Sequence, residues 1–269
     1  MAKNGQYSRE GFTAVVLAGQ RRGDSPLAGR FNLPLKALIP VAGKPMIQRV
    51  VESLYSSQWV GPIFISCPEI APFVKVGTVG PLLDSGQIRW IQSERSPSSS
   101  ASKALRRGVE DSPVLLTTAD HALLTTEMVD FFCNEAHGSG ADLVVGLVRL
   151  ELVQKAYPRA RRTYYSFSDG RYCSCNLFGF MTYRAYGAVD YWQRVEEKRK
   201  HPLQVVGSFG WLWVLRYLVG TVSLEMAFRR ASDILGCNIR AVLMPFPEAA
   251  IDVDTMSDWQ MAEKIASDY

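Results

Sequence analysis

The chain has 269 residues, 47% of them hydrophobic, and 30 basic against 26 acidic residues give it a formal charge of +4. This length and apolar content suffice for one large domain with a full core, and the small positive excess does not by itself indicate a nucleic-acid-binding surface. The five cysteines are scattered and odd in number, which is typical of reduced thiols and not of a disulfide framework.

Two segments bear on cellular location. Residues 1–11 are polar and lack an apolar core, so we expect a short disordered lead-in and no secretory signal. The longest apolar stretch, 209–219, is too short to span a bilayer and contains Arg216, so we expect a buried or interfacial helix, with a lipid-facing patch as its alternative. The chain is therefore predicted to be cytoplasmic, without a transmembrane segment.

The first half of the chain alternates strand-like runs of Val, Ile and Leu with helical segments. This alternation predicts an α/β fold with a mostly parallel sheet that helices cover on both faces. The expected strands are 13–17, 63–66, 87–92, 114–118 and 141–148, and the expected helices are 45–57, 71–77, 101–109 and 126–137.

In the second half the pattern changes. Residues 163–167 and 176–183 alternate like strands around the turn signal Ser168-Asp169-Gly170, which predicts a β-ribbon added to the sheet. Residues 184–235 are predicted to be helical and 239–244 to form a last strand. A terminal helix follows, capped by Thr255 with Asp258, so residues 12–269 are expected to form a single domain.

The first predicted strand runs into a loop of small residues and arginines. Such a loop can present backbone N–H groups to a phosphate, although its spacing matches neither a P-loop nor a dinucleotide-binding fingerprint. Lys36, further along, is predicted to supply a positive charge near the α-phosphate. The residues predicted to bind nucleotide here are Leu17, Ala18, Gly19, Gln20, Arg21, Arg22 and Gly23.

Carboxylates come at the ends of two extended segments. Asp120 follows the strand 114–118, at a carboxyl end where ligands collect in open sheets, and Thr125 is better placed than Asp120 to cap the next helix. We therefore expect Asp120 to bind a metal ion. Asp252 and Asp254 alternate along the chain and should point to opposite faces, so only one of them is expected to join Asp120.

Taken in order, these motifs resemble a known family. Leu17-Ala18-Gly19, the segments 36–41 and 43–46, the strand ending at Asp120, and Asp252-Val253-Asp254-Thr255 are similar to the nucleotidyltransferases related to molybdenum-cofactor guanylyltransferase and sugar-phosphate nucleotidyltransferases. The resemblance covers nearly the whole chain. It implies a Rossmann-like three-layer sandwich of the glycosyltransferase-A type, and the joining of an NTP to a phosphorylated acceptor with loss of pyrophosphate and use of Mg²⁺.

The resemblance also implies roles for individual residues. Lys36 takes the place of the catalytic lysine and Asp120 that of the first magnesium ligand, while Asp252 matches the second ligand and Asp254 is its substitute. Gln20 stands where the family commonly has a second glycine, which leaves open whether Arg21 or Arg22 is the catalytic arginine; we expect Arg22.

Further expectations concern the two substrates. Ser98 and Ser99 lie in the region where relatives contact the base or ribose. Asn176 and Arg162 are expected to bind the acceptor, and Arg161 and Lys155 lie close enough in sequence to help hold its phosphate. The base is left open among CTP, GTP and UTP.

Residues 184–235 have no counterpart in the smallest relatives and are predicted to form an acceptor lid or a homodimer surface.

His121 is expected to pack beside the site and not to act as a base, because an acceptor phosphate is already ionised. The alternative functions are a glycosyltransferase that uses a finished nucleotide sugar and a non-catalytic nucleotide-binding protein.

Overall fold

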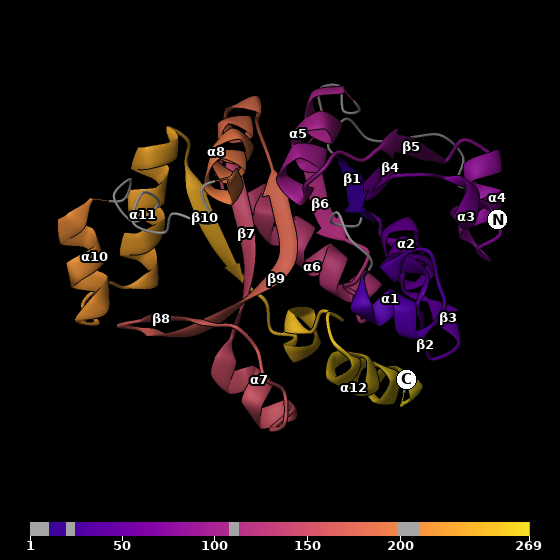
Figure 1. Ribbon diagram of the computed structural model, residues 1–269. Coiled ribbons are helices and arrows are strands. Elements are labelled where there is room, and N and C mark those ends of the chain that lie inside the picture. The colour runs from indigo at the N-terminus through magenta and orange to yellow at the C-terminus, as the bar shows by residue number, and fades with distance from the viewer. Residues whose placement is uncertain (1–10, 20–24, 108–112, 198–209, 269) are drawn as a thin grey trace.

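An eight-stranded mixed sheet runs through the computed structural model, which describes residues 11–19, 25–107, 113–197 and 210–268 (Figure 1). Its main path has the strand order β10-β7-β9-β6-β1-β4-β5, and β8 pairs with β9 beside this path. The strand bounds are β1 Phe12–Leu17, β4 Val60–Cys67, β5 Ile88–Gln92, β6 Val114–Thr118, β7 Leu143–Arg149, β8 Tyr165–Phe167, β9 Gly170–Phe180 and β10 Ile239–Leu243.

Most neighbouring strands are parallel, as the sequence predicts. β1 pairs in parallel with β4 and β6, β4 with β5, and β10 with β7. The predicted β-ribbon exists as the hairpin β8–β9, but β9 begins earlier than expected, at Gly170, and lies inside the sheet, antiparallel to both β6 and β7. Its alternate residues Cys173, Cys175 and Leu177 are buried, which gives this strand an apolar face for the core.

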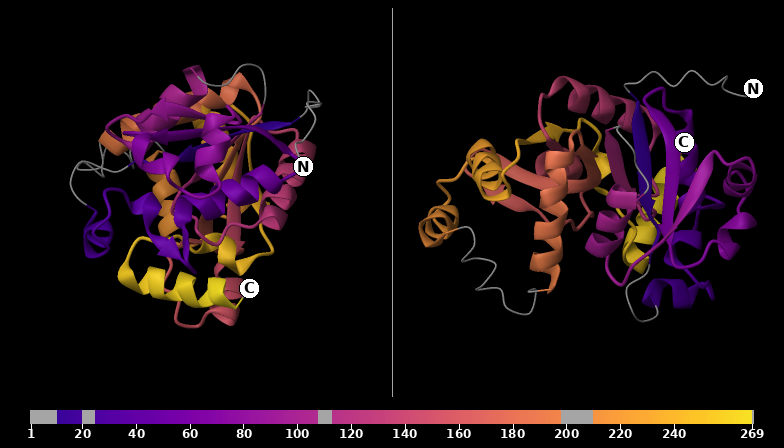
Figure 2. Two further views of the ribbon diagram at one scale, coloured as in Figure 1. Left: turned by 90° about the vertical axis from the view of Figure 1, so that its right-hand side faces the viewer. Right: turned by 90° about the horizontal axis from the view of Figure 1, so that it is seen from above.

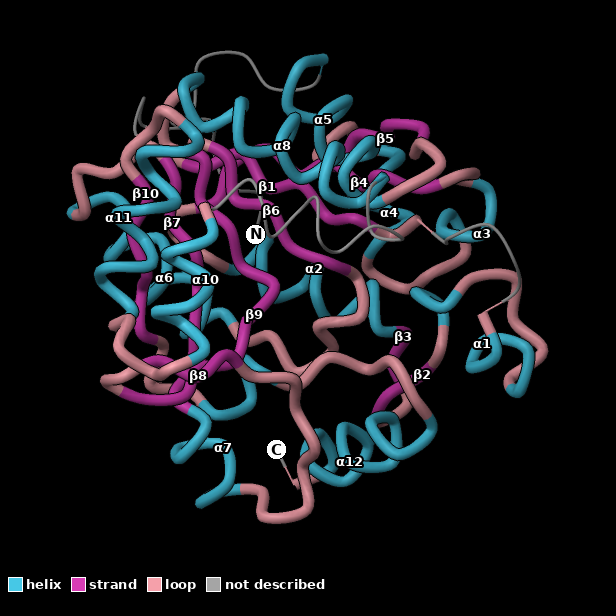
Figure 3. Tube along the Cα trace, turned by 60° about the vertical axis from the view of Figure 1, so that its left-hand side comes forward, coloured by secondary structure: helices cyan, strands magenta, loops and turns pink. Residues whose placement is uncertain are grey.

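Helices cover both faces of the sheet (Figure 3). In β1, Ala14 and Val16 pack with α2 and α6, whereas Val15 and Leu17 pack with α5 and α8 on the opposite face. This alternation confirms the three-layer sandwich, because successive strand residues point to opposite faces. The helix bounds in these layers are α2 Met46–Ser56, α5 Pro97–Arg107, α6 Thr126–Gly138, α8 Tyr186–Glu197 and α11 Leu224–Leu235, with the short α3 Ala71–Val74 and α4 Val79–Asp84 near β5.

A separate layer of short elements lies along the edge where the parallel strands end (Figures 1 and 2). Trp259 of α12 donates a hydrogen bond of 2.8 Å to the carbonyl of Pro40, which ties the last helix to the small β2–β3 ribbon. The capping predicted for α12 is confirmed, since Thr255 and Asp258 form a complete capping box. The elements of this edge are α1 Pro26–Arg30, η1 Lys36–Leu38, β2 Pro40–Val41, β3 Lys44–Pro45, α7 Leu150–Ala156, η4 Pro247–Ala250 and α12 Met256–Ser267, whereas η2 Tyr183–Ala185 follows β9 at the opposite end of the sheet.

The serine-rich segment differs from the prediction. It was expected to be a loop before a helix at 101–109, but α5 begins at Pro97, and the serines form its first turn. Proline is favoured at the first helical position because its missing N–H is not needed there. The hydroxyl of Ser100 accepts a hydrogen bond of 2.9 Å from the backbone of Glu94, so the turn is fixed by its own side chains.

A buried or interfacial helix was expected at 209–219. The helix is present but it is not buried, and an interfacial role stays a prediction; Phe209 itself lies outside the described residues. α10 spans Trp211–Leu218 and leaves Trp211, Leu212 and Leu218 between 72% and 74% exposed. The helix lies outside α11, beyond the edge strand β10, and none of the described helices or strands covers its outer side (Figure 1). A lid or a dimer surface in this region stays a prediction.

Candidate active site

Lys36 lies between two carboxylates at the carboxyl end of the sheet. Its Nζ donates hydrogen bonds of 2.6 Å to Asp120 and 2.5 Å to Asp254. η1 carries the lysine, and Asp120 follows β6, where the Thr118 hydroxyl holds its other oxygen at 2.5 Å. The fold thus brings Lys36 together with Asp120, which lies 84 positions further along the chain, and with Asp254, which lies 218 positions further along.

The segment after η4 supplies the remaining acids. The backbone N–H of Val253 bonds to the carbonyl of Asp120 at 3.0 Å, which fixes this extended segment beside the end of β6. The predicted alternation is confirmed, because Asp254 turns to Lys36 while Asp252 turns to Arg162 and, at 3.5 Å, to the amide of Asn176. The carboxylate that shares a cation with Asp120 is therefore Asp254.

Burial and neighbouring charges both shift the pKa values of the groups in this centre. Burial lowers the pKa of Lys36, but the carboxylates of Asp120 and Asp254 outweigh it, so the pKa is raised and the ammonium is charged. Burial raises the pKa of Asp120, and the Lys36 charge more than offsets this, so that carboxyl is ionised with a lowered pKa. Burial, with the charges of Asp254 and Asp120, raises the pKa of Asp252.

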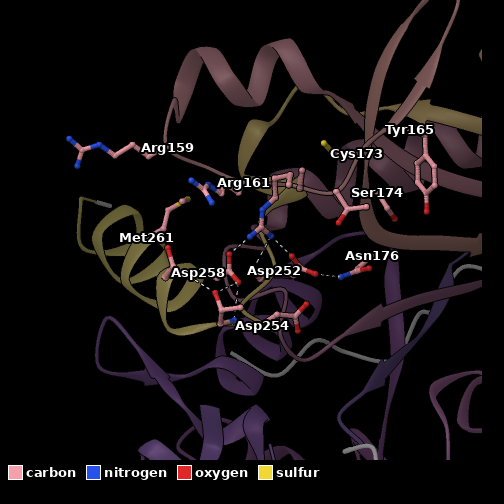
Figure 4. A pocket seen from close by; sticks show the side chains of 15 residues that line it. Arg159, Arg161, Tyr165, Cys173, Ser174, Asn176, Asp252, Asp254, Asp258 and Met261 are labelled. Carbon is pink, nitrogen blue, oxygen red and sulfur yellow. Dashed lines mark hydrogen bonds and ion pairs between the residues drawn. The ribbon is translucent and has the colours of Figure 1, made fainter. Parts of the chain in front are cut away.

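Arg162 forms the second cation of the centre and is only 8% exposed. Its guanidinium donates to the carboxylates of Asp252 and Asp258 and, at 3.2 Å, to the carbonyl of Asp252 (Figure 4). Asp258 also closes the capping box of α12, so one buried arginine joins the metal-candidate segment to the last helix. Its role in binding the acceptor stays a prediction, since these two carboxylates already hold the guanidinium.

Replacement of Arg162 by alanine is expected to lower the free energy of unfolding by about 3–5 kcal/mol, because it leaves the buried carboxylate of Asp258 and the half-buried carboxylate of Asp252 without their shared partner. Urea or thermal unfolding measures this loss. Arg161→Ala serves as the matched control: its side chain is exposed and makes no ion pair within the described residues, so its effect should stay within about 0.5 kcal/mol. Equal stability of the two variants would contradict the structural role of Arg162.

The predicted phosphate-binding loop is described only in part. Leu17 and Ala18 are buried, and the carbonyl of Leu17 accepts a hydrogen bond from Ala119 at 3.0 Å, which places this loop next to Asp120. Gly19 is exposed, and a Cβ added to it would lie 3.3 Å from the Cβ of Ser93. Gln20, Arg21, Arg22 and Gly23 lie outside the described residues.

The two serines predicted to contact the nucleotide differ in accessibility. Ser98 is 1% exposed and its hydroxyl binds Glu196 of α8, whereas the Ser99 hydroxyl accepts a hydrogen bond of 3.1 Å from Ser96. Ser98 thus contributes to the packing of α5 on α8. A nucleotide contact by either serine stays a prediction.

Asn176 occupies an irregularity in β9. Its φ is +51°, and the pairing with β7 shifts register between Val145 and Leu147, where Gly146 leaves room for the displaced strand. Bulges of this kind re-aim side chains, and asparagine tolerates the left-handed region better than most residues. The bulge turns the Asn176 amide toward Asp252 (Figure 4).

A cavity of about 580 Å³ opens beside these groups, between β9, the segment that precedes β8, and the start of α12. Asp252 and Asp254 line it, whereas Lys36 and Asp120 lie just beyond its lining. Sequence reasoning missed Arg159, although it stands in the basic cluster Arg159-Ala160-Arg161-Arg162 directly before a predicted strand. The lining residues are Arg159, Arg161, Arg162, Thr163, Tyr165, Cys173, Ser174, Asn176, Ala250, Asp252, Asp254, Thr255, Ser257, Asp258 and Met261.

His121 is buried next to the site. It is 1% exposed, and burial lowers its pKa to about 4 against the opposing charge of Asp120. The ring is therefore neutral near pH 7 and enclosed by the protein, as expected for a packing residue.

The charge balance and donor set of the centre fit a divalent cation. Magnesium in nucleotide enzymes is usually held by one or two carboxylates together with phosphate oxygens and water. Within the described residues, no cluster of three His, Cys, Asp or Glu side chains is placed to bind a metal ion. The carboxylates in these ion pairs outnumber the cations. The carboxylates are those of Asp120, Asp252, Asp254 and Asp258, and the cations are those of Lys36 and Arg162.

Comparison with known proteins identifies the family. Residues 14–169 match the MobA-like NTP transferase domain. The chain belongs to this nucleotidyltransferase family. The matched part of this MobA-like chain contains Lys36, Asp120 and the loop after β1, whereas Asp252, Asp254 and α12 follow it. No match was found among curated protein sequences.

Solved structures agree with the fold over nearly the whole chain. A hypothetical transferase from Thermus thermophilus is 30% identical with a TM-score of 0.75, covering 93% of this chain and 99% of its own. 4-Diphosphocytidyl-2C-methyl-D-erythritol synthase from Anaerococcus prevotii is 11% identical, with a TM-score of 0.59 and 96% of both chains covered. CMP:2-keto-3-deoxy-manno-octonic acid synthetase in complex with CTP is 14% identical, with a TM-score of 0.57 and coverage of 96% and 99%.

In the part of the MobA-like chain that the structure describes, every helix is too short or too polar to cross a bilayer.

Proposed function

We propose that the chain is a magnesium-dependent nucleotidyltransferase that transfers a nucleoside monophosphate from an NTP to a phosphorylated small-molecule acceptor. The observation that carries this proposal is the position of Lys36, whose ammonium joins Asp120 to Asp254 at the border of the cavity. Family membership supports the reaction class, and the separate cavity supports a second substrate of limited size.

The proposed reaction is an in-line displacement. An oxygen of the acceptor phosphate attacks the α-phosphorus of the NTP, a new O–Pα bond forms, and the bond from Pα to the bridging oxygen of the β-phosphate breaks. Pyrophosphate leaves with that electron pair. Because a phosphate monoester is ionised near neutral pH, the attack needs no general base, which agrees with a neutral, enclosed His121.

The chain's own groups then position and neutralise charge. The Lys36 ammonium stays protonated because its carboxylate neighbours raise its pKa, so it can stabilise negative charge that develops around the α-phosphate. Asp120 would hold Mg²⁺, with Asp254 or Asp252 as the second carboxylate. When bound, Mg²⁺ would neutralise phosphate charge and orient the leaving pyrophosphate.

Screening for pyrophosphate release tests this proposal. CTP, GTP, UTP and ATP are each combined with a panel of phosphorylated acceptors, with Mg²⁺ or with EDTA. CTP comes first because one solved structure of similar fold holds CTP. We expect one NTP and one acceptor class to give pyrophosphate only with Mg²⁺.

Two outcomes would contradict the proposal. Turnover of a nucleotide sugar without pyrophosphate release from any NTP would favour the glycosyltransferase alternative. NTP binding that is independent of Mg²⁺ and without turnover would favour a non-catalytic nucleotide-binding protein.

A further inference from the structure

The cavity beside the proposed reaction centre carries positive charge that the centre itself does not use. Arg162 is held by Asp252 and Asp258, so its charge is compensated within the protein. Arg159 and Arg161 line the same cavity, both are exposed, and within the described residues neither guanidinium makes an ion pair or a hydrogen bond. Two arginines are therefore available to an anionic ligand at this place.

The reaction centre extends from the wall of the cavity to Lys36 and Asp120, which lie beyond the lining. Lys36 and Asp120 are not among the lining residues, whereas Asp254 both lines the cavity and contacts Lys36. An acceptor whose phosphate reaches the centre at Asp254 therefore leaves the rest of the molecule in the cavity, where Arg159 and Arg161 lie. Figure 4 shows both arginines on the opposite side of the Asp252–Asp258 acid pair from Asn176.

The rest of the lining combines polar and apolar side chains. Hydroxyl and amide groups come from Thr163, Ser174, Asn176 and Ser257, and Tyr165, Ala250 and Met261 add apolar surface. The hydroxyl and amide groups can bind the hydroxyls of a short carbon chain, and the apolar side chains can pack against its carbon atoms.

We propose that the acceptor is a short, hydroxylated phosphomonoester with a second anionic group, and that Arg159 and Arg161 bind this second group. The inference rests on the proposed nucleotidyl transfer and narrows its substrate class. The planar guanidinium can bind a carboxylate or a phosphate through two parallel hydrogen bonds, and two such groups together select against an acceptor that is neutral at this end.

Matched pairs of acceptors provide the first test. Phosphogluconate differs from sorbitol phosphate, and phosphoglycerate from glycerol phosphate, by a carboxylate in place of a hydroxymethyl group. We expect binding of at least one acid, measured by calorimetry in the presence of the preferred NTP and Mg²⁺, to be about 10- to 100-fold tighter than binding of its neutral partner. The same preference should appear as a lower KM in pyrophosphate release.

Substitution of the two arginines provides the second test. Arg161→Ala and Arg159→Ala are expected to raise the KM for the acidic acceptor about 10-fold each, with little change in kcat or in the KM for the NTP. Arg161→Lys should recover part of the loss, since it keeps the charge without the planar fork. Arg240→Ala, which removes an exposed arginine from the edge strand β10, is the matched control and should change neither KM.

The outcomes separate this inference from the proposed function. Equal binding of the acid and neutral members, or a similar rise in KM for both members in the arginine variants, would overturn the inference while pyrophosphate release upholds the reaction. A failure of all four compounds to bind would likewise contradict the inference, and the wider acceptor panel would still test the reaction. Absence of pyrophosphate release from every NTP and acceptor would contradict the proposed function itself.

Discussion

Replacement of Asp120 by asparagine is expected to lower pyrophosphate release by about 10³-fold, because it removes a full negative charge from the proposed magnesium site while keeping the side-chain shape. Asparagine retains an oxygen that can accept the Thr118 hydrogen bond, but its NH₂ group then replaces the oxygen that accepts from Lys36, so the contact of Lys36 with this side chain is lost as well. Initial rates at several Mg²⁺ concentrations measure the effect, and we expect the remaining activity to need more Mg²⁺.

The control for this variant is Asp84→Asn. Asp84 is exposed at the end of α4, far in sequence from the site, and its loss changes the net charge of the chain by the same amount. We expect normal rates and an unfolding midpoint close to the parent from Asp84→Asn. Full activity of Asp120→Asn at the parent's Mg²⁺ requirement would exclude Asp120 as a metal ligand.

Replacement of Lys36 by methionine is expected to lower kcat by about 10²- to 10³-fold, because the charge that stabilises the transition state at the α-phosphate is lost. The structure adds a second expectation. Since Lys36 now binds both Asp120 and Asp254, its removal leaves these carboxylates without a cation, and Mg²⁺ should bind the nucleotide-free variant more tightly. Calorimetry with Mg²⁺ and rapid-quench rates together check the two effects.

A lower kcat together with tighter Mg²⁺ binding distinguishes a catalytic lysine from a structural one. A lysine that only stabilised the fold would lower activity through unfolding and would weaken Mg²⁺ binding with it. Lys75→Met removes an exposed lysine next to α3 and should change neither quantity. Unchanged kcat in Lys36→Met would contradict the catalytic role.

The order of the elements could be predicted because the core pattern is local. Val15 and Val16 alternate between two helical layers, and the stripe Met46, Ile47, Val50, Val51 and Leu54 is wholly buried in α2. Burial of such runs depends on periods of two or 3.6 residues, which the sequence displays directly.

The errors occur where the local pattern has two outcomes. The apolar run of α10 was expected to be buried or interfacial, and burial is not observed, because the exposure of a helix depends on whether another layer lies over it, which no short-range pattern records. The hairpin β8–β9 was recognised by its turn, but the insertion of β9 between β6 and β7 depends on pairing with strands that precede it in sequence.

The sequence by itself determined the α/β alternation, the resemblance to nucleotidyltransferases, and the candidates Lys36, Asp120, Asp252 and Asp254. It left open which of the last two carboxylates shares a cation with Asp120. Only the tertiary structure decided that Asp254 meets Lys36 while Asp252 meets Arg162, because the direction of each side chain is set by the contact of Val253 with the end of β6.

The same reason applies to the basic cluster before β8. Composition shows that arginines are present, but whether an arginine is compensated or free depends on which carboxylates the fold brings to it. Arg162 and Arg161 are neighbours in sequence and opposite in this respect: the first is enclosed between two acids, and the second faces the cavity. Whether a charged side chain is compensated is therefore decided by its distance from charged groups elsewhere in the sequence, and the sequence alone does not give these distances.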